Sequence, residues 1–315
     1  MNFLELFSQL PGAVSQGLIW GIMAIGVYIT YKILDIPDLT VDGSLCTGGA
    51  VCVMMILSGA PIPLSLACAF GVGVLTGLVT GIFHTFCGIS AILAGILTQL
   101  GLWSINLAIM GKANQAVNVN NYDLLVSLRY LQEIAGGLRP FYYSPIFIVG
   151  IFCVLIIAVL YWFFGTELGT SIRATGANPN MARAQGINTN LNKVLGLMLS
   201  NGLVALSGAM LSQYQGFADI NMGRGAIVIG LAAVIIGEVL FSRVFKNFAL
   251  HLLGVIFGSV IYYIVIQVIL WTKLVDANYL KLFSALVVAV FLSVPYWREK
   301  SKSTKKGDKD NVKAS

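Results

Sequence analysis

The chain has 315 residues, of which 57% are hydrophobic and only 10% charged, and its mean hydropathy is +0.86. Soluble globular domains carry about 25% charged residues, so this composition excludes a water-soluble enzyme, a disordered protein and a nucleic-acid-binding protein. Much of the net charge of +6 lies in the tail 297–315, which holds seven Lys/Arg against three Asp/Glu. These numbers predict an all-α polytopic membrane protein, a single permease-like domain without a soluble domain attached.

About nine stretches are long and apolar enough to cross a membrane, because a spanning helix needs about 20 mostly apolar residues. They are residues 12–32, 43–59, 62–82, 88–110, 144–164, 191–213, 225–241, 247–271 and 279–296. With the tail placed inside, the inner segments hold thirteen Lys/Arg and the outer segments six. The positive-inside rule therefore predicts a basic cytoplasmic tail at 297–315 and an N-terminus on the outer side.

An acidic segment follows the first predicted span. Asp35, Asp38 and Asp42 flank Pro37, and Gly43 comes next. Charged side chains are costly inside lipid and usually face a polar cavity, and proline fits poorly in the middle of a helix. We therefore predict a broken or re-entrant helix in which Asp35, Asp38, Asp42 and Gly43 belong to a translocation pathway. An ordinary interfacial loop is the alternative.

The longest outer connection, residues 111–143, contains apolar side chains at helical spacing. These are Leu124, Leu125, Leu128, Leu131 and Ile134. The spacing favours a short amphipathic helix on the outer surface.

The inner connection 165–192 is too polar to span a membrane but carries clear helix signals. Asn178 can cap a helix that starts at Pro179, and Gly186 is a typical stop. Arg173 and Arg183 stand among small residues, which let a partner approach closely, and arginine forms oriented hydrogen bonds to carboxylates and carbonyls. The pattern predicts a short cytoplasmic helix onto which a separate protein docks.

The acidic motif returns later in the chain. DLTVDGSLCTGGAV starts at Asp38 and DINMGRGAIVIGLAA starts at Asp219, and a glycine, Gly49 or Gly230, stands eleven residues after each Asp. Five predicted spans separate the copies, so they would run through the bilayer in opposite directions, as inverted repeats of transporters do. This favours an inverted internal repeat and adds Asp219 and Arg224 to the predicted pathway; a chance likeness of two glycine-rich stretches is the alternative.

Other polar residues show no pattern of metal or redox chemistry. The five cysteines lie in apolar stretches without metal-ligand spacing, and the chain has only two histidines, so no metal site and no cofactor are expected. Glu238, near the inner end of the seventh span, precedes Arg243 and Lys246. A salt-bridged helix end or a gating pair would both explain that group.

The inner connection resembles a known pattern. GTELGTSIRATGANPNMARAQGIN is similar to the cytoplasmic coupling segment of bacterial ATP-binding cassette (ABC) importer permeases of the branched-chain amino acid and ribose type. That pattern is roughly T-x-x-G-x-x-[IL]-R-A-x-G-x-N-x-x-x-A-x-x-x-G-I, and it is met by Thr166, Gly169, Ile172, Arg173, Ala174, Gly176, Asn178, Ala182, Gly186 and Ile187. The opening GLIWGIMAIGVYITYKILDIPDLTVDGS is also similar, so the resemblance covers nearly the whole chain. It is nearest to a poorly characterised single-permease group, some members of which are linked to aromatic amino acid uptake.

The resemblance implies a permease in the bacterial cytoplasmic membrane. Its partners would be cytoplasmic ATP-binding subunits, an extracytoplasmic solute-binding protein and a second permease copy, with the route between the two permeases. It also implies a set of ATPase-coupling residues: Ile172, Arg173, Ala174, Gly176, Asn178, Pro179, Ala182, Arg183, Gly186 and Ile187. The chain has no G-x-x-x-x-G-K-[ST] phosphate loop, so ATP hydrolysis is expected in a partner subunit and the chain itself is not expected to be an enzyme.

Three function classes follow. An ABC importer permease, with an amino acid as the first candidate solute and a sugar or nucleoside as the second, explains the inner segment. An ion-gradient-driven secondary transporter would explain the repeat but lacks a buried carboxylate–histidine chain. An intramembrane enzyme is disfavoured by the absence of a Ser/His, paired-Asp or metal-ligand arrangement in the sequence.

Overall fold

The computed structural model describes residues 3–118, 121–122, 124–135, 140–241, 247–272, 282–283, 285–291 and 293. The first part of the chain forms α1 (Phe3–Tyr28), the π-helix η1 (Ile29–Ile33), α2 (Val41–Leu57), α3 (Ile62–Thr85) and α4 (Ala91–Met110). The middle forms β1 (Asn114–Ala116), α5 (Leu128–Ala135), the 3-10 helix η2 (Phe141–Tyr143), α6 (Pro145–Gly165), α7 (Glu167–Ala177) and α8 (Pro179–Ala184). The last part forms α9 (Thr189–Gln215), β2 (Phe217–Asp219), α10 (Ala226–Phe241) and α11 (Phe248–Trp271).

The prediction of a polytopic helical membrane protein is confirmed. Six helical segments are long and apolar enough to cross a membrane: Gln9–Ile33, α3, α4, α6, α9 and α11. Two predicted spans, α2 and α10, are shorter apolar helices of 17 and 16 residues. The ninth predicted stretch, 279–296, lies largely outside the described residues, so the number nine stays a prediction. The expectation of purely helical structure was wrong in one detail, because β1 pairs antiparallel with β2.

Glycines let the central helices approach until their backbones touch. A Cβ atom on Gly48 of α2 would meet the backbone carbonyl of Ala205 in α9, and one on Gly208 of α9 would meet that of Leu45 in α2. Small residues at helix contacts are typical of membrane proteins, because association in lipid depends on close van der Waals packing rather than on the hydrophobic effect. The contact between α2 and α9 therefore depends on these two glycines.

The first helix of each half packs against helices of the other half. Helix α9 lies against α2 and α3, whereas α1 lies against α10 and α11. Gly21 of α1 faces Ile256 of α11, and Gly202 of α9, 181 residues later, faces Val74 of α3. The offset of 181 residues is the one that separates Asp38 from Asp219, so equivalent positions make equivalent contacts.

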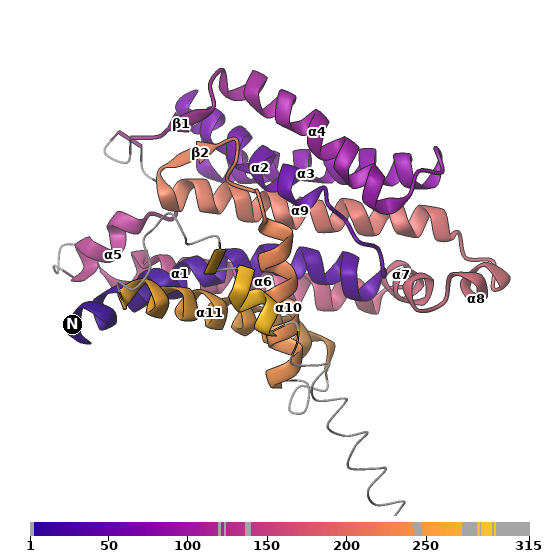
Figure 1. Ribbon diagram of the computed structural model, residues 1–315. Helices are drawn as coiled ribbons and strands as arrows, with labels where there is room; N and C mark the ends of the chain where they lie inside the picture. The colour runs from indigo at the N-terminus through magenta and orange to yellow at the C-terminus, as the bar shows by residue number, and fades with distance from the viewer. Residues whose placement is uncertain are drawn as a thin grey trace, which may run out of the picture.

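The connections gather at two ends of the helix bundle, as Figure 1 shows. The strands β1 and β2 and helix α5 lie at one end, and α7 and α8 lie at the other. From those ends, the segments 34–40 and 220–225 turn back toward the middle of the bundle, where α2 and α10 begin (Figure 1). Both short apolar helices therefore start inside the bundle rather than at its surface.

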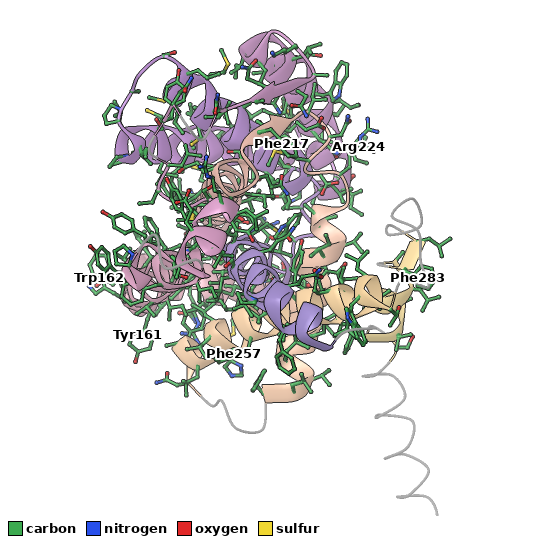
Figure 2. All side chains as sticks on the ribbon, turned by 90° about the vertical axis from the view of Figure 1, so that its left-hand side faces the viewer. Tyr161, Trp162, Phe217, Arg224, Phe257 and Phe283 are labelled. Carbon is green, nitrogen blue, oxygen red and sulfur yellow. The ribbon has the colours of Figure 1, made fainter. Side chains whose placement is uncertain are left out.

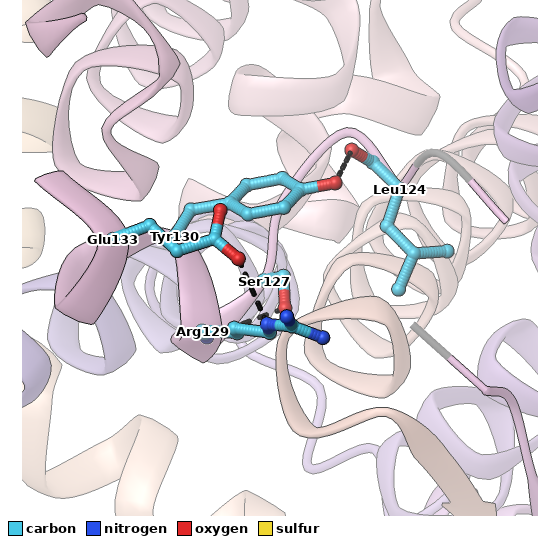
Figure 3. A network of polar contacts seen from close by, with 5 residues as sticks. All are labelled: Leu124, Ser127, Arg129, Tyr130 and Glu133. Atoms are coloured by element: carbon cyan, nitrogen blue, oxygen red, sulfur yellow. Dashed lines mark hydrogen bonds and ion pairs between the residues drawn. The ribbon is translucent and has the colours of Figure 1, made fainter. Parts of the chain in front are cut away.

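The predicted helix in the outer connection is confirmed as α5, with local polar contacts that fix its start. Arg129 forms an ion pair with Glu133, with Nε and Oε1 2.8 Å apart, and its backbone N–H donates to Ser127 Oγ (Figure 3). Tyr130 OH donates to the carbonyl of Leu124 at 3.0 Å (Figure 3). Leu124 and Leu125 precede the helix, so the apolar spacing placed its start four residues too early.

Candidate translocation pathway and coupling segment

Asp38 is buried in a polar network, not in an open passage. It is 2% exposed, and its carboxylate accepts from Thr40 N at 2.9 Å and from Asn201 Nδ2 at 2.7 Å. Asn201 Oδ1 in turn accepts from Ser44 Oγ at 2.6 Å. Burial raises the pKa of the Asp38 carboxyl, and the hydrogen bonds from Thr40 and Asn201 oppose that shift. The network ties the segment before α2 to α9.

Asp35 lies three residues earlier in a different setting. It is exposed and has a φ of +54°, in the left-handed region. Asparagine, aspartate and glycine adopt this conformation most readily. Asp35 therefore shapes the turn after η1 and shares no site with Asp38.

Asp42 joins the two repeated segments directly. Its Oδ2 accepts from Gly225 N and its Oδ1 from Ile227 N, both at 3.0 Å, so this carboxylate of α2 caps the start of α10. A carboxylate at a helix N-terminus satisfies free amides and interacts favourably with the helix dipole. One turn later, Cys46 Sγ accepts from Gly223 N at 3.1 Å. The segment after Asp219 is thus held against α2.

Asp219 occupies the same local geometry as Asp38. Its Oδ1 accepts from Asn221 N at 2.7 Å, two residues ahead, just as Asp38 accepts from Thr40 N. Such turns are typical of aspartate at the start of a bend. Asp219 Oδ2 also accepts from Asn114 Nδ2 at 3.3 Å across the β1–β2 pair. It therefore anchors the outer connection.

A cavity of about 120 Å³ collects three of the six predicted pathway residues. Asp42, Gly43 and Arg224 line it, whereas Asp35, Asp38 and Asp219 are not among the residues of its wall. The other lining residues are Cys46, Gln99, Leu100, Trp103, Asn106 and Ile220. Sequence reasoning missed the wall formed by α4. The available signal was two amides, Gln99 and Asn106, seven residues apart on one face of an otherwise apolar helix.

The predicted helix in the inner segment is confirmed, together with its boundaries. Asn178 Oδ1 accepts from Met181 N at 3.0 Å, Pro179 occupies the first turn of α8, and Gly186 has a φ of +79° just after its end. The preceding helix α7 was not predicted as a separate element. Its signal was Thr166, which caps α7 by accepting from Gly169 N at 3.3 Å.

The coupling residues divide between a buried face and an exposed face. Ile172 and Ala182 are buried, and Gly176 and Ile187 are half-buried. The remaining predicted coupling residues are exposed: Arg173, Ala174, Asn178, Pro179, Arg183 and Gly186. Anchoring on one side thus leaves a surface of small and basic residues on the other.

The two arginines of the coupling segment have different surroundings. Arg183 Nε donates to Thr189 Oγ1, at the first residue of α9, at 2.8 Å. The guanidinium of Arg173 lies 5.5 Å from the ring centre of Phe248, which starts α11. Arg173 therefore faces α11, and Arg183 stays beside α8.

Helix α7 is fastened to the elements that lead toward the cavity. Asn192 of α9 donates to Thr175 Oγ1 at 2.9 Å and accepts from Ser171 Oγ at 3.2 Å. A Cβ on Gly176 would meet the carbonyl of Ile33 in η1. Since η1 continues into the segment 34–40 and then into α2, a displacement of α7 acts on the chain that carries Asp42.

Glu238 pairs with a residue of the other half. Its Oε1 lies 2.9 Å from Lys32 Nζ, which links α10 to η1. Arg243 and Lys246, which follow Glu238 in the sequence, lie outside the described residues. Half-exposed ion pairs contribute little to stability, so this pair is better suited to fix the relative position of α10 and η1.

Replacing Asp38 with Ala is expected to destabilise the protein by about 2 kcal/mol, because the buried amide of Asn201 loses its acceptor. The measurement is thermal unfolding of the purified protein in detergent. Asp35→Asn is the matched control: it removes a charge three residues away and keeps a residue suited to positive φ, so its midpoint should stay near that of the wild type. Equal midpoints for the two variants would contradict the structural role of Asp38.

Comparison with known proteins identifies the family. The family described as "Branched-chain amino acid transport system / permease component" matches residues 10–294. The chain is 38% identical to the tyrosine transport system permease protein of Clostridioides difficile (strain R20291), over 91% of both chains. It is 34% identical to an uncharacterized protein of Rickettsia prowazekii (strain Madrid E), over 89% of this chain and 95% of the other.

More distant similarity extends to sugar transport. The chain is 27% identical to the galactofuranose transporter permease protein of Escherichia coli (strain K12), over 69% of this chain and 60% of the other. No solved structure matches. The match across the membrane helices and the coupling segment shows that this chain belongs to the branched-chain amino acid type of permease components and is an ABC importer permease.

Proposed function

We propose that this chain is the membrane-spanning subunit through which an ABC importer moves a free amino acid into a bacterial cell. The observation that carries the proposal is the continuous connection from the exposed coupling residues of α7 and α8, through the contact of Gly176 with Ile33, to the cavity at Asp42. The tyrosine transport permease among the relatives supports an amino acid as the solute. The galactofuranose relative keeps a sugar as the second candidate.

The proposed architecture is an inverted repeat. One half contains α1 to α4 and the other starts at α9, with Asp38 and Asp219 in equivalent turns. The equivalent contacts of Gly21 and Gly202 support this assignment. In such transporters two related halves move against each other around a central site.

Partners are assigned to the two ends of the bundle. The end with α7 and α8 receives the ATP-binding subunits on the cytoplasmic side, which is also the side of the tail 297–315. The end with α5, β1 and β2 faces the extracytoplasmic solute-binding protein, as does the N-terminus. Two copies of the permease form the pathway between them, and the partner subunits hydrolyse ATP.

Reconstitution tests the proposal. The permease is placed in proteoliposomes with the ATPase subunit and the binding protein encoded beside it, and uptake of a ¹⁴C-labelled mixture of the twenty standard amino acids is measured with and without ATP. ATP-dependent uptake is expected. Uptake of labelled sugar alone would favour the second candidate, and gradient-driven uptake by the permease without the ATPase would contradict the proposal.

A further inference from the structure

The cavity between α2, α4 and the start of α10 has a wall that the proposed function has not yet used. Gln99, Trp103 and Asn106 of α4 line it on one helix face, opposite Asp42 and Arg224. These side chains come from segments more than 100 residues apart in the chain. Their meeting places a carboxylate, a guanidinium, two amides and an indole around about 120 Å³.

Asn106 has an unused acceptor at this cavity. The residue is 1% exposed, and its Oδ1 accepts no hydrogen bond from any side chain or amide in the part of the chain that the structure describes. A buried polar atom without a partner costs about 1–3 kcal/mol. Most buried polar atoms in proteins are satisfied, so an exception that lines a cavity points to a ligand with a hydrogen-bond donor.

Arg224 supplies the opposite charge at the mouth of the cavity. It is exposed and projects outward from the body of the protein (Figure 2), and none of the ion pairs between described residues involves it. A guanidinium binds carboxylates in a preferred planar geometry. An exposed arginine and a glutamine on a membrane protein face would be costly against lipid. This face is therefore suited to a polar passage.

Asp42 and Trp103 complete the chemistry. Each carboxylate oxygen of Asp42 accepts one amide of α10 and keeps acceptor capacity for another donor. Trp103 is 46% exposed and lies beside Leu100, which forms an apolar wall next to the polar groups. The cavity thus offers a cation, several acceptors and an apolar surface together.

Resting on the proposed function, we propose that this cavity is a relay site for a zwitterionic α-amino acid. Its carboxylate binds Arg224, its α-ammonium donates to Asn106 Oδ1 and Asp42, and its side chain lies along Trp103. A neutral sugar would satisfy the amides but leave the guanidinium without a counter-charge. The site is small and open to one side, which suits brief occupancy during passage.

The test uses the reconstituted complex and the ¹⁴C-labelled mixture of the twenty amino acids. Asn106→Leu keeps a similar side-chain volume and removes the acceptor, and Arg224→Gln removes the charge. ATP-dependent uptake is expected to fall about tenfold in each, since each loses a hydrogen bond to a charged group. Asn106→Asp, which retains an acceptor, is expected to recover most of the uptake.

Ser104→Leu is the matched control, because Ser104 is exposed on the same helix and is not in the cavity wall. It should transport like the wild type. Co-purification with the ATPase subunit shows that each variant is folded, and Arg224→Gln changes an exposed residue whose loss leaves packing intact. Full uptake by Asn106→Leu and Arg224→Gln beside an active wild type would overturn the relay site alone. Absence of ATP-dependent amino acid uptake by the wild type would contradict the proposed function.

Discussion

Replacing Arg183 with Glu is expected to abolish the stimulation of ATPase activity by the loaded binding protein in the reconstituted complex. Arg183 is exposed on α8, within the coupling segment, and reversal of its charge would place a carboxylate where a partner expects a donor. Loss of a charged contact at an interface costs about 2–5 kcal/mol, which corresponds to more than a tenfold loss of coupling. The measurement is ATP hydrolysis with and without solute-loaded binding protein.

Two companion variants separate docking from local structure. Thr189→Val removes the hydrogen bond that Arg183 makes inside the chain but keeps the positive charge, so stimulation should remain within about twofold because exposed internal bonds contribute little. Arg183→Lys should retain part of the stimulation because the charge stays while the guanidinium geometry is lost. Full stimulation in Arg183→Glu would show that the ATPase does not dock on this face.

Replacing Gly48 with Leu is expected to have the largest effect on stability. The Cβ of any larger residue would overlap the carbonyl of Ala205, and a backbone group has no rotamer by which to move aside. The helices α2 and α9 would have to separate, which would also strain the bonds from Asn201 to Asp38 and Ser44. Overpacking of this kind costs about 3 kcal/mol.

Thermal unfolding monitored with a thiol-reactive dye can measure this effect, because Cys46, Cys52 and Cys153 are buried in the folded protein. Gly71→Leu provides the control. A Cβ on Gly71 meets no atom within 4 Å, and the residue is exposed on α3. Its unfolding midpoint should match that of the wild type, whereas an unchanged midpoint in Gly48→Leu would refute the close contact.

Local signals predicted the coupling segment well, and the reason is physical. The end points of α8 depend on Asn178, Pro179 and Gly186, whose conformational preferences act over three or four residues. Apolar length alone located eight of the predicted spans on helices. Helix α7 was missed because its glycines and threonines weaken the helical pattern, and its cap at Thr166 was the only strong cue.

Long-range geometry was not available from the sequence. The repeat placed Asp35, Asp38 and Asp42 in one predicted pathway, but only Asp42 reaches the cavity, because the helical phase at the start of α2 turns it toward α10. Asn106 contributes to the same cavity from α4, more than 60 residues away. The strands β1 and β2 have three residues each, too few for an alternating pattern to be recognised.

The exchange of partners between the halves has a consequence for synthesis. Helix α1 emerges first from the ribosome, yet the helices that cover much of it, α9, α10 and α11, are made last. Until then its glycine-lined flank is solvated by lipid chains alone. Completion of the fold therefore waits for the final third of translation, and a chain interrupted before α11 would leave its oldest segment unsheltered and open to quality-control proteolysis.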